Sequence, residues 1–271
     1  MKKKVSVITI NYNNLDGLKR TFDSVVNQTW QEFEYIIIDG GSIDGSKAFI
    51  ERNKDKIDYW VSEQDKGIYN ALNKGIQKAT GDYLLFLNSG DHFYSEEVLA
   101  NNLHHLIEHD IIAFDIHFLG TEYDKIGRHL DIICFSFLFE DTFAHQAVFI
   151  KRTLFDIVGL YDENLEIVAD WKFFIQAIVY HKSTYKAIHE VLSTYYLEGI
   201  SCSPKGLVLR KREREAVLKN EFSLFYDDYV IAEQNRKLLS MNRFKMLLEL
   251  EKTYLGRKFS SLTLKVLSKF F

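Results

Sequence analysis

Acidic residues that follow short apolar segments are the side chains of this sequence best suited to chemistry. The segment 88–91, Asn-Ser-Gly-Asp, comes directly after the apolar run 83–87. A carboxylate at the end of a buried strand could help to hold Mg²⁺ or Mn²⁺ and so neutralise a diphosphate. With equal weight, Asp91 could simply cap the turn or helix that follows. Spacing alone leaves both interpretations of Asp91 open.

Asp39 and Tyr12 also follow apolar runs, and they suggest binding of a planar ligand. Asp39 ends the run 35–38, and Gly40 and Gly41 after it allow a ligand to approach the backbone closely. The Asp39 carboxylate could accept hydrogen bonds from a base or a ribose. Tyr12 could lie flat beneath a base. A strand-end aspartate is more often a turn former, and a tyrosine here is as often ordinary packing.

Asp170 and the pair His145-Gln146 are the candidates in the second half of the chain. Asp170 precedes an aromatic run at 171–174, in a position that predicts the start of a helix. Its carboxylate could accept the proton of an attacking hydroxyl, or it could serve only as a helix cap. His145 and Gln146 begin a predicted strand and could contact a diphosphate or an acceptor. A single histidine without metal-ligand spacing is more often structural.

Alternating strands and helices must position these residues. Near-continuous apolar runs predict strands at 5–10, 35–39, 57–62 and 83–88, and apolar residues spaced by three and four predict helices at 15–26 and 68–79. This order is the signature of βαβ units and a largely parallel sheet. Ligands bind such sheets at the carboxyl ends of the strands. Asn11, Asp39 and the segment 88–91 should therefore converge.

The second half is less regular and ends in a helical tail. The pattern predicts a helix from 95 to about 109 and strands at 111–118, 132–139 and 145–151. The region 207–252 predicts two surface helices that break near 226–228. The loop 198–204, which contains the only proline, is the expected boundary between a main domain at 1–204 and a C-terminal extension at 205–271.

Composition and missing motifs exclude several classes of protein. The 271 residues are 46% hydrophobic, which is ample for a sizeable core, and the net charge of −4 predicts no nucleic-acid partner. Cys134 and Cys202 predict reduced thiols rather than a disulfide framework, and no apolar run reaches the roughly 18 residues of a membrane span, so we expect a cytoplasmic protein. A glycine-rich dinucleotide fingerprint, a Gly-Lys-Ser/Thr loop and a His-Glu-x-x-His pattern are missing from the sequence. Dehydrogenases, P-loop enzymes and zinc hydrolases are therefore disfavoured.

Several ordered segments carry a family resemblance. They are VSVITINYN at 5–13, YIIIDGGSIDGS at 35–46, SEQDKGIYNALNKGI at 62–76, GDY at 81–83, LNSGD at 87–91, HQA at 145–147, GLYDE at 159–163 and ADW at 169–171. Together they closely resemble the family-2 glycosyltransferases of GT-A fold, over roughly residues 4 to 201. The resemblance implies an α/β fold whose mostly parallel sheet is flanked by helices, with a donor half at about 1–95 and an acceptor half at about 96–204.

The resemblance also implies roles for particular residues. Tyr12 and Asp39 would contact the base of a nucleoside-diphosphate sugar, Asp65 would line the donor pocket, and Asp170 would be the general base. Asp91 would serve a diphosphate bound to Mg²⁺ or Mn²⁺, although the family often has Asp-x-Asp where this chain has only one carboxylate. The residues expected to bind the donor are Thr9, Asn11, Tyr12, Asp39, Asp65, Asn88 and Ser89. The residues expected to contact the acceptor or the diphosphate are His145 and Gln146.

These implications define an expected reaction and its rivals. We expect an inverting transfer of a single sugar, with UDP-linked donors favoured, because the Gln-x-x-Arg-Trp segment and the membrane spans of processive members are missing. A nucleotidyltransferase is the second hypothesis, but residues 11–17 lack the glycine- and basic-rich loop that it requires. A non-catalytic nucleotide-sugar-binding protein is the third hypothesis, because the acidic motif at 88–91 contains only one carboxylate.

The end of the tail has an amphipathic pattern of its own. Apolar side chains fall on one helical face, with basic residues nearby. The apolar set is Leu255, Phe259, Leu262, Val266 and Phe270, and the basic set is Arg257, Lys258, Lys265 and Lys269. Members of the subgroup that the chain resembles commonly build bacterial surface polysaccharides on lipid-linked acceptors, so residues 255–271 could dock on the inner face of an anionic membrane. Packing against the catalytic domain or against a second subunit of a homo-oligomer is the equally weighted alternative.

Overall fold

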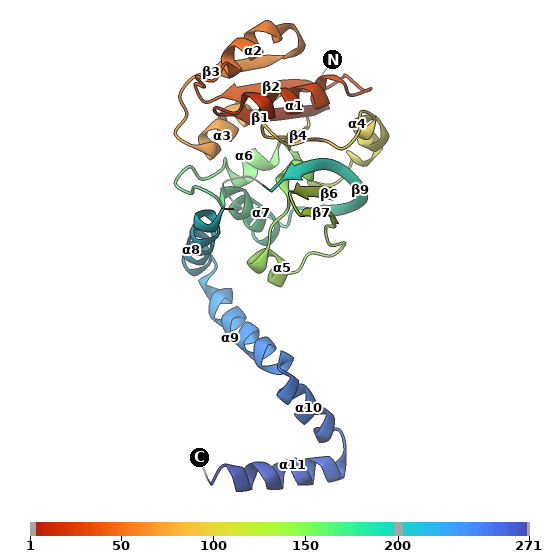
Figure 1. Cartoon of the computed structure of the whole chain (residues 1–271), viewed down its shortest axis with the longest axis vertical. Coiled ribbons are helices and arrows are strands. Elements are labelled where there is room, and N and C mark those ends of the chain that lie inside the picture. Colours follow the sequence, from red (N-terminus) through yellow and green to blue (C-terminus); the bar gives the residue numbers. More distant parts are fainter. Residues whose placement is uncertain (1–3, 198–202, 270–271) are drawn as a thin grey trace. The chain divides into compact units, whose positions relative to one another are not determined.

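The chain forms two compact units. The computed structural model describes residues 4–197 and 203–269, and the units are Met1–Arg214 and Glu215–Phe271. The first contains a β-sheet with flanking helices, and the second is helical (Figure 1).

A nine-stranded mixed sheet, counted over the described residues, forms the centre of the first unit. Its strands are β1 (Val5–Asn11), β2 (Glu34–Asp39), β3 (Tyr59–Ser62), β4 (Tyr83–Phe86), β5 (His92–Phe93), β6 (Ile111–Gly120), β7 (Tyr123–Gly127), β8 (Val148–Lys151) and β9 (Tyr185–Tyr196). The order is β3-β2-β1-β4-β8-β6-β9-β5, with β7 paired to β6. The pairs β1–β2, β1–β4 and β2–β3 are parallel, whereas β8 is antiparallel to both β4 and β6. The predicted parallel half of the fold is confirmed.

Helices cover both faces of the parallel strands. The α-helices of this unit that precede α8 (Pro204–Glu221) are α1 (Leu15–Val26), α2 (Ser46–Arg52), α3 (Ile68–Lys78), α4 (Val98–Asn102), α5 (Phe135–Glu140), α6 (Leu154–Val158) and α7 (Ala169–Val179). Leu18 and Phe22 of α1 share a core cluster with Val7 of β1. On the opposite face, α3 approaches so closely that a Cβ on Gly75 would lie 2.5 Å from the Ile8 side chain. Burial on both faces explains why β1 is apolar almost throughout.

The predicted strand at 132–139 is wrong, because this segment forms helix α5. A short apolar run cannot be assigned to a strand or a helix from periodicity alone. Within α5 only Leu138 is buried, which is the pattern of a helix that touches the core along one edge. The backbone carbonyl of Leu138 accepts a hydrogen bond from the Trp171 side chain at 2.5 Å, so α5 is fixed to α7.

Three other boundaries differ from the predictions. The helix expected from 95 to 109 is only α4 followed by the 3₁₀ helix η2 (Leu103–His105). The strand expected at 145–151 begins at Val148, because residues 145–147 form the 3₁₀ helix η3 (His145–Ala147). Pro204 begins helix α8 (Pro204–Glu221) instead of lying in a loop, a position where its missing N–H costs nothing.

The tail contains more helices than the two predicted. After α8 come α9 (Ser223–Ser240), α10 (Asn242–Glu251) and α11 (Tyr254–Leu267). The break expected near 226–228 is wrong, because these residues lie inside α9. The break lies earlier, between the end of α8 at Glu221 and the start of α9 at Ser223.

Two further expectations concern the state of the cysteines and the presence of membrane-spanning helices. Cys134 is a free, exposed thiol, whereas Cys202 lies outside the described residues. Among helices within 4–197 and 203–269, none is long and apolar enough to cross a membrane.

Candidate active site

The carboxyl ends of β1 and β2 meet around Asp39. Asn11 lies opposite Asp39 in the sheet register and donates a hydrogen bond from Nδ2 to its Oδ1 at 2.8 Å. Ser42 donates from Oγ to Oδ1 at 2.6 Å and from its backbone N to Oδ2 at 3.0 Å, and Ser62 Oγ donates to Oδ2 at 2.6 Å. Asp39 is completely buried. Its carboxylate therefore organises the loop after β2, and its predicted contact with a base stays a prediction.

An exposed aromatic ring and a carboxylate flank the same glycine beside this loop. Tyr12 is 69% exposed. A Cβ on Gly40 would lie 3.1 Å from Tyr12 Cδ2 and 3.0 Å from Asp65 Oδ2, so the three residues are adjacent. Lys74 holds the Asp65 carboxylate through an ion pair of 2.6 Å. A π face beside a hydrogen-bond acceptor is chemically suited to a nucleotide base.

The loop that follows β4 joins this region by backbone contacts. Ser89 N donates to the carbonyl of Ile10 at 3.0 Å, and Asn14 Nδ2 donates to the Ser89 carbonyl at 3.1 Å. Thr9 lies deeper, where its hydroxyl donates to the Leu87 carbonyl at 2.8 Å. The structure thus brings Asn11, Ser89 and Tyr12 to one end of the sheet, while Thr9 is buried behind them.

Asp91 faces the protein interior. It is buried, and its carboxylate accepts hydrogen bonds from the Gln146 side chain and the Tyr196 backbone. Burial raises the pKa of Asp91 to about 7, against the opposing effects of His145, Gln146 and Arg20. Within the described residues, no group of three or more His, Cys, Asp or Glu side chains is arranged to hold a metal ion. These residues do not fit a cation held by protein ligands alone, and a metal completed by donor phosphates and water stays a prediction.

Asp170 lies in the first turn of α7 and contacts two side chains from other elements. Tyr69 Oη of α3 donates to Asp170 Oδ1 at 2.9 Å, and His145 Nδ1 of η3 is 3.0 Å from Asp170 Oδ2. Burial by itself would raise the pKa of Asp170, but the hydrogen bonds from His145 and Tyr69 outweigh it and lower the pKa below its ordinary value. Asp170 is therefore a buried carboxylate that stays ionised.

His145 connects Asp170 to the loop after β4. Its second ring nitrogen, Nε2, is 3.2 Å from Asn88 Nδ2. The side chains of Asn88, His145, Asp170 and Tyr69 thus form one continuous chain of contacts, although the residues are far apart in sequence. Gln146, next to His145, is buried and contacts Asp91. The predicted residues of both halves therefore meet at one region of the first unit.

Sequence reasoning missed Tyr69 as a site residue. The helical pattern placed Ile68 on the buried face of α3, but Ile68 is exposed and Tyr69 is buried. A buried tyrosine normally requires a partner for its hydroxyl, and here that partner is Asp170. Lys74, the partner of Asp65, was missed as well. The only available signal for both was their position inside the segment 62–76.

Comparison with known proteins gives the class of this fold and site. The chain belongs to glycosyl transferase family 2, whose sequence model matches residues 6–168. Among similar proteins, an uncharacterised glycosyltransferase of Mycobacterium tuberculosis is 36% identical over 179 residues, which cover 64% of this chain and 68% of that protein. A PGL/p-HBAD biosynthesis glycosyltransferase of Mycobacterium bovis is 30% identical over 206 residues, which cover 70% of this chain and 75% of that protein.

Solved structures confirm the GT-A fold. Staphylococcus aureus TarS 1–349 in complex with UDP-GlcNAc matches with a TM-score of 0.62 and 17% identity, over 80% of this chain and 67% of that one. The mannosyltransferase PcManGT of Pyrobaculum calidifontis, in complex with GDP-Man and Mn²⁺, matches with a TM-score of 0.56 and 15% identity. The match covers 96% of this chain and 84% of that one. The chain is a glycosyltransferase with an α/β fold of GT-A type.

Proposed function

We propose that this protein transfers a single sugar, with inversion, from a nucleoside-diphosphate sugar to an acceptor hydroxyl. The observation that carries the proposal is the ionised Asp170 carboxylate, held by Tyr69 and linked through His145 to the donor-side residue Asn88. The exposed ring of Tyr12 beside Asp65 supports binding of the donor base. UDP is the favoured nucleotide, in keeping with the UDP complexes of the TarS structures.

The reaction is a single displacement. The acceptor oxygen attacks the anomeric carbon and forms the new C–O bond, while the bond to the diphosphate breaks and the nucleoside diphosphate leaves with its electron pair. The hydroxyl proton passes to the carboxylate of Asp170, which Tyr69 and His145 hold in place. Attack from the face opposite the leaving group inverts the anomeric configuration.

The substitution Asp170→Asn tests this proposal. It keeps the size of the side chain but removes the negative charge that the proton transfer requires, so transfer should fall by about 10²–10⁴-fold. Donor binding should change little, because the base contacts Tyr12 and Asp65. Asp156→Asn, at an exposed position of α6, is the matched control and should keep full activity. Full transfer by Asp170→Asn would contradict the assignment.

The products separate this function from its two rivals. Sugar transfer releases a nucleoside diphosphate, whereas a nucleotidyltransferase releases pyrophosphate. A chain that binds donors but releases neither product, with Mg²⁺ or Mn²⁺ present, would be a non-catalytic binding protein. Nuclear magnetic resonance of the phosphorus atoms in the products distinguishes all three outcomes.

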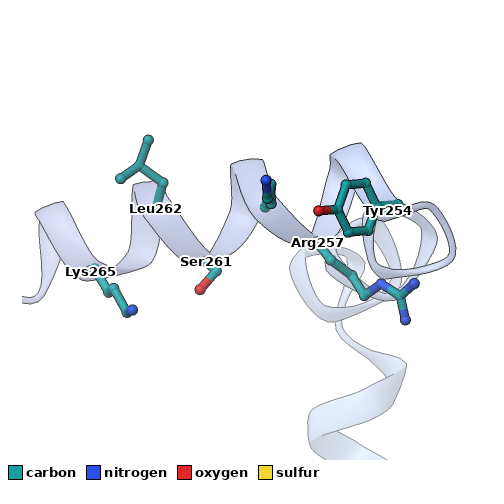
Figure 2. Close-up of a pocket in the computed structure, with 6 residues that line it drawn as sticks. Tyr254, Arg257, Ser261, Leu262 and Lys265 are labelled. Carbon is teal, nitrogen blue, oxygen red and sulfur yellow. The ribbon is translucent and has the colours of Figure 1, made fainter.

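We further propose that α11 docks on an anionic membrane, where a lipid-linked acceptor would be presented. Leu255, Phe259, Leu262 and Val266 of α11 are all exposed. The segment 252–269 contains five basic residues and no acidic residue, although the whole chain has a net charge of −4. In Figure 2, Leu262 points away from the side chains of Arg257 and Lys265. An apolar stripe with basic neighbours fits the interface of an anionic bilayer.

Co-sedimentation with vesicles tests the docking proposal. The full chain should sediment with vesicles rich in phosphatidylglycerol and not with pure phosphatidylcholine, and a chain that ends at Gly256 should lose this binding. Equal binding by the shortened chain would remove α11 from membrane docking. A full chain that ignores both vesicles but forms a dimer, which shortening dissociates, would favour packing against a second subunit instead.

A further inference from the structure

We propose that the first turns of α8 bind an anionic group of the acceptor, a phosphate or a carboxylate, on the acceptor side of Asp170. This inference rests on the transferase function proposed above, and it names a chemical property of the acceptor. The proposed site consists of Arg210 and Arg214, which lie one helical turn apart. Both arginines belong to the first compact unit of the chain, together with Asp170.

Positive charge is concentrated at the beginning of α8. Residues 204–214 contain five basic side chains and one acidic side chain, whereas the whole chain has a net charge of −4. The basic side chains are those of Lys205, Arg210, Lys211, Arg212 and Arg214. The acidic residue, Glu213, is buried, and its carboxylate accepts hydrogen bonds from the backbone N–H groups of Glu166 at 2.8 Å and Ile167 at 3.1 Å. Glu213 therefore fastens this basic segment to the loop that precedes α7.

Arg214 brings one of these charges close to Asp170. Its Nη1 donates to the backbone carbonyl of Glu140 at 2.7 Å, and its guanidinium carbon lies 5.1 Å from the centre of the Trp171 ring. Trp171 follows Asp170 in α7, and the Asp170 carboxylate interacts electrostatically with Arg214. Burial and the nearby charge of Arg210 lower the pKa of Arg214 to about 10. The guanidinium is therefore still protonated at neutral pH.

The contacts of Arg214 leave its charge without a close counterion. Its hydrogen bond goes to a backbone carbonyl and its stacking partner is an aromatic ring, so neither contact brings a carboxylate to it. Its Nε is a buried donor without a hydrogen-bond partner among the described residues. Asp170 and Asp141 favour the charge electrostatically, whereas Arg210 opposes it. An anion that bound beside this pair of arginines would stabilise both charges.

Arg210 is the member of the pair that an acceptor can reach. Residues four positions apart lie on the same face of a helix, so Arg210 lies on the same side of α8 as Arg214. Arg210 is exposed, whereas Arg214 is partly buried. A guanidinium is planar and can donate two parallel hydrogen bonds to the oxygens of a phosphate or a carboxylate. The repulsion between the two arginines would fall when such a group bound.

This arrangement defines which acceptors fit. The reacting hydroxyl must lie at Asp170, so an anionic group at Arg210 belongs to another part of the same acceptor molecule. A sugar that carries a phosphate ester meets this requirement, and so does a sugar that carries a carboxylate. A neutral sugar would leave the charges of α8 without a counterion. The site therefore favours anionic over neutral acceptors.

Titration calorimetry with three sugars tests this inference on the full chain. The protein is first saturated with UDP, which keeps phosphate groups out of the donor site. The probes are glucose 1-phosphate, glucuronate and glucose. Arg210→Gln removes the positive charge at the proposed site. Arg212→Gln is the matched control, because Arg212 is also an exposed arginine of α8 but lies about 200° around the helix from Arg210.

We expect an anionic sugar to bind the wild type at least about tenfold more tightly than glucose, and Arg210→Gln to lose most of this difference. Arg212→Gln should change the affinity by less than about twofold. Tighter binding of glucose 1-phosphate would assign a phosphate group, and tighter binding of glucuronate would assign a carboxylate. Equal binding of all three sugars, binding of none, or equal losses in both variants would overturn the inference.

Vesicle sedimentation separates this site from a membrane-binding role of α8. If Arg210→Gln weakened binding to phosphatidylglycerol vesicles and left the binding of anionic sugars unchanged, the charge would serve the membrane and the inference would be overturned. The UDP titration that comes first separates the inference from the function on which it rests. A wild-type chain that does not bind UDP would refute the proposed function itself.

Discussion

Because the ring of Tyr12 is exposed, a substitution at this position can test donor binding without changing the stability of the fold. Tyr12 is 69% exposed, so Tyr12→Ala removes little packing and should change the free energy of unfolding by no more than about 0.5 kcal/mol. If the ring stacks on the donor base, its loss should cost about 1–3 kcal/mol of binding free energy. The dissociation constant for UDP should therefore rise by about 5–150-fold. Tyr12→Phe keeps the π face and should stay close to the wild type.

Isothermal titration calorimetry with UDP measures this effect for the wild type and both variants, and urea unfolding measures their stability. The prediction concerns a difference between Tyr12→Ala and Tyr12→Phe, so a general loss of structure would not imitate it. Equal dissociation constants for the alanine variant and the wild type, at equal stability, would refute stacking on Tyr12. Equal losses in both variants would show that the hydroxyl, and not the ring, binds the donor.

Three further predictions follow from close contacts and burial. Gly40→Ala should weaken UDP binding in calorimetry, because its Cβ would lie 3.1 Å from Tyr12 and displace the ring. Gly75→Ala should lower the free energy of unfolding by about 1–3 kcal/mol, since its Cβ would lie 2.5 Å from Ile8. Burial raises the pKa of Asp91 from 3.8 to about 7, so between these pH values the folded state holds a proton that the unfolded chain releases. The free energy of unfolding of the wild type, measured with urea, should therefore fall as the pH rises from about 4 to about 7, and Asp91→Asn should lack this fall.

The parallel half of the fold could be predicted because its signals are local. Each strand is an apolar run of sufficient length, and each helix has a clear apolar face. The general rule that polar residues gather at the carboxyl ends of parallel strands then predicts the meeting of Asn11 and Asp39, which the sheet register places opposite each other.

The second half could not be predicted as well because its signals depend on distant partners. Phe135–Glu140 is an apolar run that fits a strand or a helix, and only its contact with Trp171 distinguishes them. The contact between His145 and Asp170 joins a 3₁₀ helix to a separate α-helix, so no spacing rule connects the two residues. Tyr69 likewise has its partner 101 residues away.

Three buried aspartates of this site differ in the groups that contact their carboxyls. The oxygens of Asp39 accept hydrogen bonds from two side-chain hydroxyls, an amide and a backbone N–H, so they are already engaged inside the protein. Asp91 has fewer compensating donors for its burial, and its pKa rises. Asp170 is buried as well, but Tyr69 and His145 lower its pKa, and only His145 continues the contacts towards the donor side. A sequence supplies three aspartates near strand and helix ends; the surrounding donors decide which of them can take part in proton transfer.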